Sequence, residues 1–390
     1  MGVRLAKKED IRTYYKMLSY CFNSGNSNIE NNVNNANFPA DEIIVNEIDG
    51  KVCQCTHVVP FMIHFDQNVY PMGGIAGVSS YPENRDGGGI KDILIYSLQH
   101  MKERGMIFSA LGPFAFEFYR KYGWEWGFVF QKVKFPIADI AKTLKAHHYK
   151  ELTKEDDELI DNFRNQFVSK LNGSVVHTTS IRENRWQSFY HQFMHCYAAY
   201  DENNQIEAIA FFKIENRRLI CDELFYVNET GRQHMLHFFY VHRSQVDFVE
   251  LLMPRNDNLR MLLPNPRIQY WEWANMMFRV VVAKDAFKAM KINPKAKGKF
   301  RLKVNDLQAP WNHQVFELIA ENGTLDVKEW GNAKAYDFEV SIQRLSQLVL
   351  GFMSGEEAIQ LEVVNIKNQN KIELFKKVFT KRPTMLWQMF

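Results

Sequence analysis

A glycine-rich turn, Tyr81–Ile90, is the first place where this sequence could do chemistry, because it lies between an expected strand and an expected helix. Gly87, Gly88 and Gly89 carry no side chains, so their backbone N–H groups can approach an anion closely. The turn also opens a helix, whose N-terminal dipole favours a phosphate group. Arg85 could add a bidentate contact to that phosphate. The residues alone indicate either a phosphate site or a plain tight turn, and they match neither the P-loop nor the dinucleotide fingerprint.

The C-terminus is a second candidate, because the chain ends on the apolar run Thr384–Phe390. Most C-termini are polar and poorly ordered. An apolar end predicts a tail that docks inside the protein, with the α-carboxylate of Phe390 as a fixed anion. Such a carboxylate could organise or deprotonate an amine. The alternative is a tail that only packs on a core.

The composition describes a globular protein of two or three domains, since 390 residues are too many for one ordinary core. Lys and Arg number 48 against 45 Asp and Glu, and this near balance argues against a dedicated nucleic-acid or membrane-surface protein. The 30 Phe, 16 Tyr and 8 Trp residues indicate large buried interfaces or deep pockets. Neither an apolar signal segment after Met1 nor a run of ~18 apolar residues is found, so we expect a cytoplasmic protein.

Cysteines and histidines suggest no metal site. The cysteines are odd in number and widely spaced, which predicts reduced thiols and no disulfide framework. They are Cys21, Cys53, Cys55, Cys196 and Cys221. Cys53 and Cys55 lie in an expected strand but lack a second ligand pair with zinc spacing, so core packing is favoured. His57, His64 and His313 have no carboxylate within sequence reach and are expected to be core or surface residues.

The first segment alternates helices and strands, which indicates an α/β layer. Asp10 could cap the first helix, and an Asp-Gly pair at 49–50 favours a type I′ hairpin turn. The expected order is helix 8–21, Asn-rich loop 23–37, hairpin 42–59, strand 69–80, helix 90–104, strand 106–111, helix 114–122 and strand 128–135.

The order of hairpin, strand, helix and strand occurs twice, which indicates a weak internal duplication. After a charged helix at 151–170, the second copy comprises hairpin 197–212, strand 220–227, helix 230–242 and strand 248–252. Beyond about residue 285, three short strands (300–306, 314–319 and 335–340) precede a helix at 341–353. We therefore expect three domains, at 1–150, 151–285 and 286–390.

The turn resembles the acetyl-coenzyme A motif of the GNAT acetyltransferase superfamily, which reads Arg/Gln-x-x-Gly-x-Gly/Ala. Arg85, Gly88 and Ile90 fall on this pattern, although Ile90 replaces the usual small residue and Asp86 stands where a basic residue is common. The helix that contains Tyr119 and continues to Trp124 adds to the likeness.

Over its full length the chain is similar to the Eis (enhanced intracellular survival) family of N-acetyltransferases. The resemblance implies two tandem GNAT domains followed by a third, sterol-carrier-protein-like α+β domain, in an α+β and α/β fold. It rests on Val78–Ile90, Phe118–Trp124, Met276–Arg279 and Phe390. In the second unit the corresponding turn at 230–234 has one glycine and looks degenerate.

The resemblance also implies roles for particular residues. Acetyl-coenzyme A would be held by Val78, Ser79, Ser80, Arg85, Asp86, Gly87, Gly88, Gly89 and Ile90. Tyr119 would be the general acid, because a phenol of pKa ~10 can donate a proton to a thiolate of pKa ~8.5. The Phe390 carboxylate would assist deprotonation of the amine and orient Tyr119. The alternative for Tyr119 is packing on the sheet, with Tyr122 as the second candidate.

The implied acceptor is a primary amine of a cationic substrate, such as an aminoglycoside or a lysine side chain. Relatives in this family assemble as hexamers, so a homo-oligomer is expected, without nucleic acid, membrane or metal. A non-catalytic carrier of acyl-coenzyme A or another apolar ligand is the second hypothesis, because the third domain resembles a lipid-carrier fold. In the first hypothesis that domain delivers Phe390 to the first.

Overall fold

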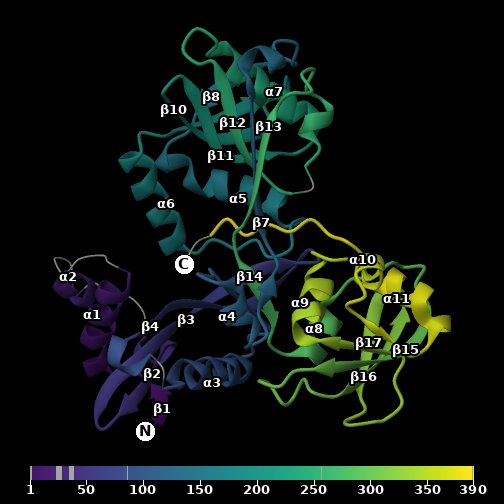
Figure 1. The fold of residues 1–390 in the computed structure, drawn as a ribbon. Helices are drawn as coiled ribbons and strands as arrows, with labels where there is room; N and C mark the ends of the chain where they lie inside the picture. The colour runs from purple at the N-terminus through teal and green to yellow at the C-terminus, as the bar shows by residue number, and fades with distance from the viewer. Residues whose placement is uncertain (1, 23–28, 35–38, 86, 256, 389) are drawn as a thin grey trace. The chain divides into compact units, whose positions relative to one another are not determined.

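The computed structural model describes residues 2–22, 29–34, 39–85, 87–255, 257–388 and 390 (Figure 1). The chain forms two compact units. The first comprises Met1–Phe128, Met276–Arg382 and Gln388–Phe390, and the second comprises Val129–Asn275 and Pro383–Trp387.

A sheet of seven strands in the described residues forms the base of the first unit, in the order β1-β2-β3-β4-β5-β14-β6. The strands are β1 (Gly2–Leu5), β2 (Ile43–Ile48), β3 (Lys51–Phe65), β4 (Asn68–Ser80), β5 (Phe108–Leu111), β6 (Glu125–Trp126) and β14 (Met277–Val280). Neighbours pair antiparallel except β4 and β5, which are parallel. The α/β layer expected from the sequence is confirmed.

Helices cover both faces of this sheet. They are α1 (Ile11–Cys21), α2 (Ile29–Asn34), α3 (Gly89–Glu103) and α4 (Phe116–Arg120). Alternate residues of β2 point to opposite faces. Ile43 and Val45 join a buried cluster with α1, whereas Ile44 joins the cluster that contains α3. The two helices therefore pack against opposite faces of the sheet.

Local features of this unit agree only in part with expectation. Asp49 and Gly50 have positive φ angles of 50° and 77°, as a type I′ turn requires. The Asp10 carboxylate does not cap α1, because it accepts hydrogen bonds from the Lys7 N–H and from Arg4. Part of the expected Asn-rich loop is helical, as α2 shows, while residues 23–28 and 35–38 lie outside the described residues.

The second unit has its own sheet, in the order β13-β7-β12-β11-β10-β9-β8. Its strands are β7 (Val129–Pro136), β8 (His148–Glu151), β9 (His195–Tyr200), β10 (Ile206–Glu215), β11 (Arg218–Tyr226), β12 (Phe248–Met253) and β13 (Gln269–Ala274). Its helices are α5 (Asp157–Val168), α6 (Thr179–His191) and α7 (Glu229–Val241). The repeated order of hairpin, strand, helix and strand is present. The expected charged helix starts later, because β8 takes its first residue.

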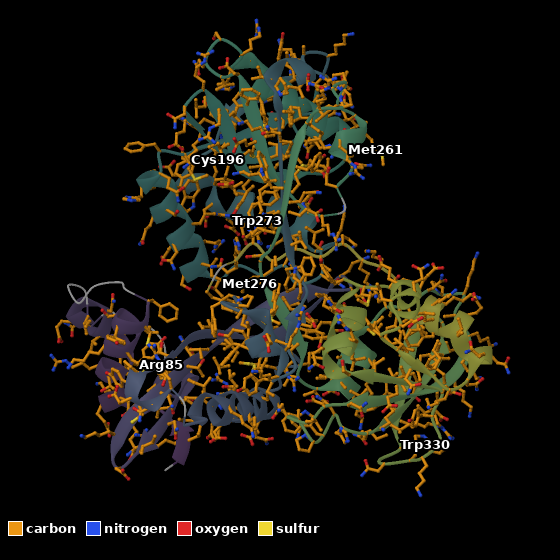
Figure 2. The ribbon with its side chains drawn as sticks, in the orientation of Figure 1. Arg85, Cys196, Met261, Trp273, Met276 and Trp330 are labelled. Carbon is orange, nitrogen blue, oxygen red and sulfur yellow. The ribbon has the colours of Figure 1, made fainter. Side chains whose placement is uncertain are left out.

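Two strands lie in sheets that the order of the sequence does not suggest. β7 follows the first segment directly but pairs with β12 and β13, whereas β14 follows β13 but pairs with β5 and β6. The change occurs between Trp273 on β13 and Met276, which are both labelled in Figure 2. The Gly127 and Phe128 N–H groups donate to the Met276 carbonyl, so the two segments are adjacent where each changes sheet.

The third segment of the chain folds as an α+β layer within the first unit. Its sheet has the order β17-β16-β15-β18-β19. The strands are β15 (Gly298–Asn305), β16 (Val315–Glu321), β17 (Thr324–Glu329), β18 (Phe338–Ser341) and β19 (Asn365–Ile366), and the helices are α8 (Ala283–Ala289), α9 (Ile342–Leu350), α10 (Gly355–Gln360) and α11 (Ile372–Val378). α9 ends before the expected residue 353, because Gly351 adopts a left-handed φ of 81° and stops the helix.

A buried ion pair joins this layer to the first sheet. Arg279 on β14 and Asp306, which follows β15, are both fully buried, and Arg279 Nη2 lies 2.9 and 2.8 Å from the two carboxylate oxygens. The guanidinium also lies 5.4 Å from the centroid of the Trp124 ring. At Gly123, with a φ of 94°, a Cβ would lie 1.5 Å from Arg279 Nη1, so only glycine leaves room for this pair.

Substitution of Asp306 tests how much this pair contributes to stability. Asp306→Ala leaves a buried guanidinium without its carboxylate, and we expect the free energy of unfolding in urea to fall by roughly 3–5 kcal/mol. Arg279→Met should cost less, because Asp306 still accepts hydrogen bonds from Asn312 and from the Ala309 N–H. Equal losses in the two variants would contradict this account.

Candidate active site

The first sheet opens at the end of β4. Among the described residues, β5 pairs with β4 only from Met72 to Ile75, although β4 continues to Ser80 and stays paired with β3 on its other side. The residues that follow Ile75, namely Ala76, Gly77 and Val78, are half-exposed. Their backbone groups on the side that faced β5 are therefore open to an extended ligand that adds to the strand edge.

A bulge at Gly77 shapes this opening. The register of β3 and β4 shifts between Cys55 and His57, and Gly77 adopts a left-handed φ of 59°. A Cβ at Gly77 would lie 2.9 Å from Leu18 Cδ2 on α1, so both the conformation and the space require glycine. Bulges bend a strand away from its neighbour, which accounts for the separation of β4 from β5 at this point.

The glycine turn leads from the open strand into α3. Gly88 precedes α3 with a φ of 75°, and no side chain of the described residues caps the helix. Gly87 and Gly88 are exposed, whereas Gly89 is buried. The first N–H groups of α3 are thus available to an anion, as an N-terminal phosphate site requires. Asp86 lies outside the described residues.

Two buried amides support the turn from below, and sequence reasoning missed both. The Asn46 amide donates to Gln54 Oε1 over 2.6 Å, and Gln54 Nε2 donates to the Asn84 carbonyl over 2.8 Å. A Cβ at Gly89 would lie 1.9 Å from Gln54 Oε1, so the start of α3 rests directly on this pair. The available signal was the polar character of Asn46 and Gln54 inside otherwise apolar strands.

The remaining residues expected to hold the cofactor gather at the same place. Arg85, labelled in Figure 2, is exposed, and its Nε lies 3.5 Å from the Ser80 carbonyl. Ser79 is buried, and its hydroxyl has no hydrogen-bond partner in the part of the chain that the structure describes. Val78 and Ile90 pack against the cluster beneath α3.

Tyr119 packs on Phe114, which lies three residues beyond the end of β5. Tyr119 is only 3% exposed and belongs to the same buried cluster as Ile75 and Leu111, the last pair of β4 and β5. Its ring lies 5.4 Å from that of Phe114 and 5.0 Å from that of Phe118. Burial raises the pKa of Tyr119 to about 12, so the phenol keeps its proton at neutral pH.

Tyr122, the second candidate, is half-buried and packs on Phe118 at 5.6 Å between ring centroids. Burial raises its pKa as well, and the nearby Asp92 carboxylate adds to the shift. The sequence placed the two tyrosines on one helix, but α4 ends at Arg120. Tyr122 therefore lies beyond the helix, in the turn that leads to Gly123.

The apolar tail is packed, as the sequence predicts. Met385 and Leu386 are fully buried in the second unit, where the Met385 N–H donates to the Asn172 carbonyl over 3.1 Å. Trp387 packs on Phe225, with ring centroids 6.1 Å apart.

Phe390 returns to the first unit and lies on its sheet. Its ring is 4.8 Å from that of Phe61, and a Cβ at Gly74 would lie 2.7 Å from it. A Cβ at Gly73 would instead meet Met101 of α3, so Phe390 occupies the face opposite α3. No hydrogen bond joins Phe390 to the Tyr119 hydroxyl among the described residues, and the orientation of Tyr119 by the Phe390 carboxylate stays a prediction.

An ion pair at the tip of the β3–β4 hairpin fixes the start of the tail. Arg382 Nε lies 2.7 Å from Asp66 Oδ1, and both side chains are almost fully buried. The other Asp66 oxygen accepts the Lys291 N–H over 2.7 Å, while the Arg382 N–H donates to the Gly351 carbonyl. One carboxylate thus anchors the tail and the segment before the third sheet.

His57 has a carboxylate partner, contrary to the expectation from the sequence. Glu42 Oε2 lies 3.3 Å from His57 Nε2, and both residues are buried. The fold brings together residues that are 15 positions apart by pairing β2 with β3. His64 is buried in the core, and His313 Nδ1 accepts the Asp306 N–H over 3.2 Å.

Three family models match successive parts of the sequence. An acetyltransferase (GNAT) domain matches residues 2–127, a second GNAT domain matches 177–280, and a sterol carrier protein domain matches 283–387. The chain contains two GNAT domains and a sterol carrier domain. Its domains are those of an acetyltransferase. A comparison with curated proteins finds no match.

Solved structures share this fold over the whole chain. A GNAT-family protein from Anabaena variabilis is 19% identical with a TM-score of 0.86, and covers 100% of both chains. A probable N-acyltransferase from Enterococcus faecalis is 21% identical with a TM-score of 0.87, over 100% of this chain and 99% of that one. Eis1 from Mycobacterium abscessus is 13% identical with a TM-score of 0.84, over 100% of both. The resemblance to the Eis family is confirmed.

The turn of the second GNAT domain is closed by its own side chains. The Asn228 side chain caps α7 by accepting the Gly231 N–H over 2.9 Å. A Cβ at Gly231 would lie 2.3 Å from the Glu207 carbonyl, and Arg232 is paired with Asp257 at 2.8 Å. These contacts occupy the groups that an anion would need, which agrees with the degenerate sequence.

Two further features concern membrane-spanning helices and the cysteines. Within the described ranges, no helix combines the length and the hydrophobicity that crossing a membrane requires. All five cysteines are free thiols.

Substitution of Gly74 tests the seat of Phe390. Gly74→Ala places a methyl group in the space of the Phe390 ring, and overpacking costs about 1–3 kcal/mol. We expect carboxypeptidase to remove the last residues about tenfold faster or more. Gly112→Ala is the control, because its Cβ would make an ordinary 3.5 Å contact with Met276. An unchanged rate for Gly74→Ala would show that the ring does not rest there.

Proposed function

We propose that this protein is an acetyl-coenzyme A-dependent N-acetyltransferase that modifies a primary amine of a cationic substrate. The observation that carries the proposal is the opening between β4 and β5, which lies beside both an uncapped, glycine-lined helix N-terminus and the buried phenol of Tyr119. When bound, acetyl-coenzyme A supplies an activated acetyl thioester.

The residues at the opening fit such a donor. Backbone groups of Val78, Ser79 and Ser80 along the open edge of β4 would hold the amides of its pantetheine arm. The N–H groups at Gly87 to Ile90 and the exposed Arg85 would hold its phosphates. The support of the turn by Gln54 and Asn46 keeps these groups in place before binding, which lowers the entropy cost of the complex.

Tyr119 is suited to the role of general acid. Its hydroxyl, whose pKa burial raises to about 12, holds a proton at neutral pH, and direct contact with the departing thiolate would let it donate that proton although the raised pKa makes it a weaker acid. Its place beside the last β4–β5 pair supports this role, since a donor thioester at the opening would lie next to it.

The Phe390 carboxylate would assist the loss of a proton from the attacking amine. The packing of its ring on Phe61 and Gly74 ties the terminus to β4, one residue before the last pair with β5. The terminus and Tyr119 approach the opening from opposite faces of the sheet. An amine that enters from the Phe390 side would therefore meet the donor between the two groups.

Aromatic rings near the opening support a cationic acceptor. Phe61 and Phe390 are both half-buried and leave part of each ring accessible. The face of an aromatic ring attracts an ammonium group, which aminoglycosides and lysine side chains both carry. Assembly as a homo-hexamer in the cytoplasm belongs to the same proposal and rests on the resemblance to the Eis family.

The match to a sterol carrier domain keeps the carrier hypothesis as the second candidate. Four lysines and an arginine are among the residues that line a cavity on that domain, so the cavity suits an apolar ligand poorly. The carrier hypothesis would be favoured if acetyl-coenzyme A bound and no amine released its thiol.

Substitution of two glycines with left-handed φ angles, one at each end of α3, tests the phosphate turn. Gly88→Ala and Gly105→Ala should each cost roughly 1 kcal/mol of stability, because both positions have positive φ and open space around a Cβ. Only Gly88→Ala should weaken coenzyme A binding, by about tenfold in calorimetry, because its methyl group intrudes where a phosphate would lie. If Gly88→Ala and Gly105→Ala bound coenzyme A with equal affinity, the phosphates would lie elsewhere.

Conservative changes test the general acid. Tyr119→Phe removes the proton and should lower kcat by roughly 10²–10⁴-fold in a thiol-release assay, with coenzyme A affinity unchanged. The activity of the native protein should not decline on deprotonation of Tyr119 up to about pH 10, because the pKa of this group is about 12. Tyr122→Phe is the matched control, and the role would pass to Tyr122 if only that variant lost activity.

Two changes at the terminus separate the carboxylate from the ring. One glycine added after Phe390 moves the carboxylate while the ring remains, and kcat should fall by about 10²-fold. Phe390→Leu keeps the carboxylate and should mainly raise KM for the amine, because a cation–π contact is lost. Full activity of the extended chain would show that the carboxylate takes no part.

A further inference from the structure

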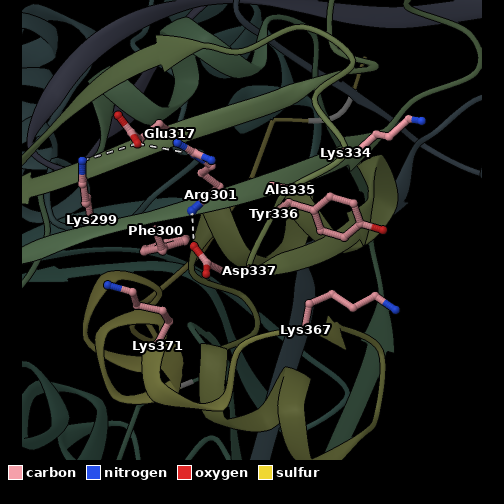
Figure 3. Close-up of a pocket in the computed structure, with 10 residues that line it drawn as sticks. All are labelled: Lys299, Phe300, Arg301, Glu317, Lys334, Ala335, Tyr336, Asp337, Lys367 and Lys371. Carbon is pink, nitrogen blue, oxygen red and sulfur yellow. Dashed lines mark hydrogen bonds and ion pairs between the residues drawn. The ribbon is translucent and has the colours of Figure 1, made fainter.

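A cavity on the third sheet, far in sequence from the proposed active site, is lined by positively charged residues (Figure 3). Its volume is about 490 Å³. The lining comes from the start of β15, from β16, from the loop before β18 and from the segment after β19. The cations are Lys299, Arg301, Lys334, Lys367 and Lys371, and the carboxylates are Glu317 and Asp337.

Both carboxylates are already engaged. Glu317 Oε1 lies 3.5 Å from Arg301 Nε and 3.8 Å from Lys299 Nζ. Asp337 accepts the Arg301 N–H and the Asn368 amide, each over 2.7 Å. These bonds fix the floor of the cavity, and among the described residues neither carboxylate forms an ion pair with Lys334, Lys367 or Lys371.

Three of the lysines have no ion-pair partner within the described part of the chain: Lys334, Lys367 and Lys371. The backbone holds Lys367 close to the floor, since its N–H donates to the Asp337 carbonyl over 2.8 Å. Like charges around one cavity repel each other, and an anion between them removes that cost. The lining carries an excess of three positive charges, from five cations and two carboxylates.

The arrangement favours a ligand with several separated negative groups. Figure 3 shows Lys299 and Lys371 towards one side of the cavity and Lys334 and Lys367 towards the other. One small anion would contact only one of these pairs. The Arg301 guanidinium also lies 3.5 Å from the centroid of the Trp330 ring, which is 42% exposed and offers a flat surface at the rim.

We propose that this cavity binds a ligand that carries two or more phosphate groups. Its volume lies within the range of about 300–1,000 Å³ that is typical of small-molecule sites, which is more than one phosphate needs. Lysines act as point charges for phosphate and make no demand on its orientation. The site is separate from acyl transfer, because all of its lining residues belong to the third sheet and its loops.

Calorimetry on the full chain tests this proposal, in the native protein and in Gly88→Ala, which identifies any binding of the probes at the phosphate turn of the first domain. The probes are inorganic phosphate, inorganic pyrophosphate, ADP, and phosphatidylcholine vesicles with and without phosphatidylinositol bisphosphate. Pyrophosphate and ADP should bind more tightly than phosphate. Lys367→Gln/Lys371→Gln should weaken their binding by roughly tenfold or more, because two charge contacts are lost.

Lys288→Gln/Lys377→Gln is the matched control, since it removes the same charge from exposed lysines of the third domain that do not line the cavity. It should leave affinity unchanged, and acetyl transfer should not change in either variant. Binding only to the bisphosphate vesicles, with the same dependence on Lys367 and Lys371, would identify the phosphates as those of a lipid headgroup. The proposal fails if no probe binds, or if both double variants lose affinity equally.

Discussion

The first domain depends on one constraint: β4 must lose its partner on one side while it keeps the other. Gly77 makes this possible, since its left-handed conformation produces a bulge and no side chain fits against Leu18. β3 stays paired with β4 as far as Ser80, so the bent strand is held on one side where its other side is open. The buried phenol of Tyr119, the glycine turn and the seat of Phe390 all lie around this opening.

The parts that could be predicted from the sequence are those with local causes. The hairpin at Asp49 and Gly50 requires left-handed angles that these residues adopt readily, and the glycines before α3 indicate a close approach of the backbone. The order of the domains and the fold class could also be predicted, because the motifs that indicate them lie one after another along the sequence. Tyr119 could be named only through resemblance, since nothing local distinguishes it from a packed tyrosine.

The parts that could not be predicted depend on pairings between distant segments. β7 alternates like any strand and β14 is short and mostly apolar, so the sequence does not show that each joins a sheet remote from its neighbour in the chain. His57 gained its carboxylate partner only when β2 aligned Glu42 beside it. The cavity at Lys367 and Lys371 likewise brings together four segments that are distant from one another in the sequence.

The two GNAT domains show how small the local difference between an open and a closed phosphate turn is. In both, among the described residues, the parallel pairing ends before the longer strand does: β5 pairs with β4 as far as Ile75, and β12 pairs with β11 as far as Cys221. Exposed Gly87 and Gly88 leave the N-terminus of α3 uncapped, whereas the Asn228 side chain caps α7. A capped terminus already has its N–H groups satisfied, so an anion would have to displace an internal hydrogen bond there. The second domain has the same sheet but a closed turn. We infer that it keeps the fold for packing, which includes the contact of Trp387 with Phe225.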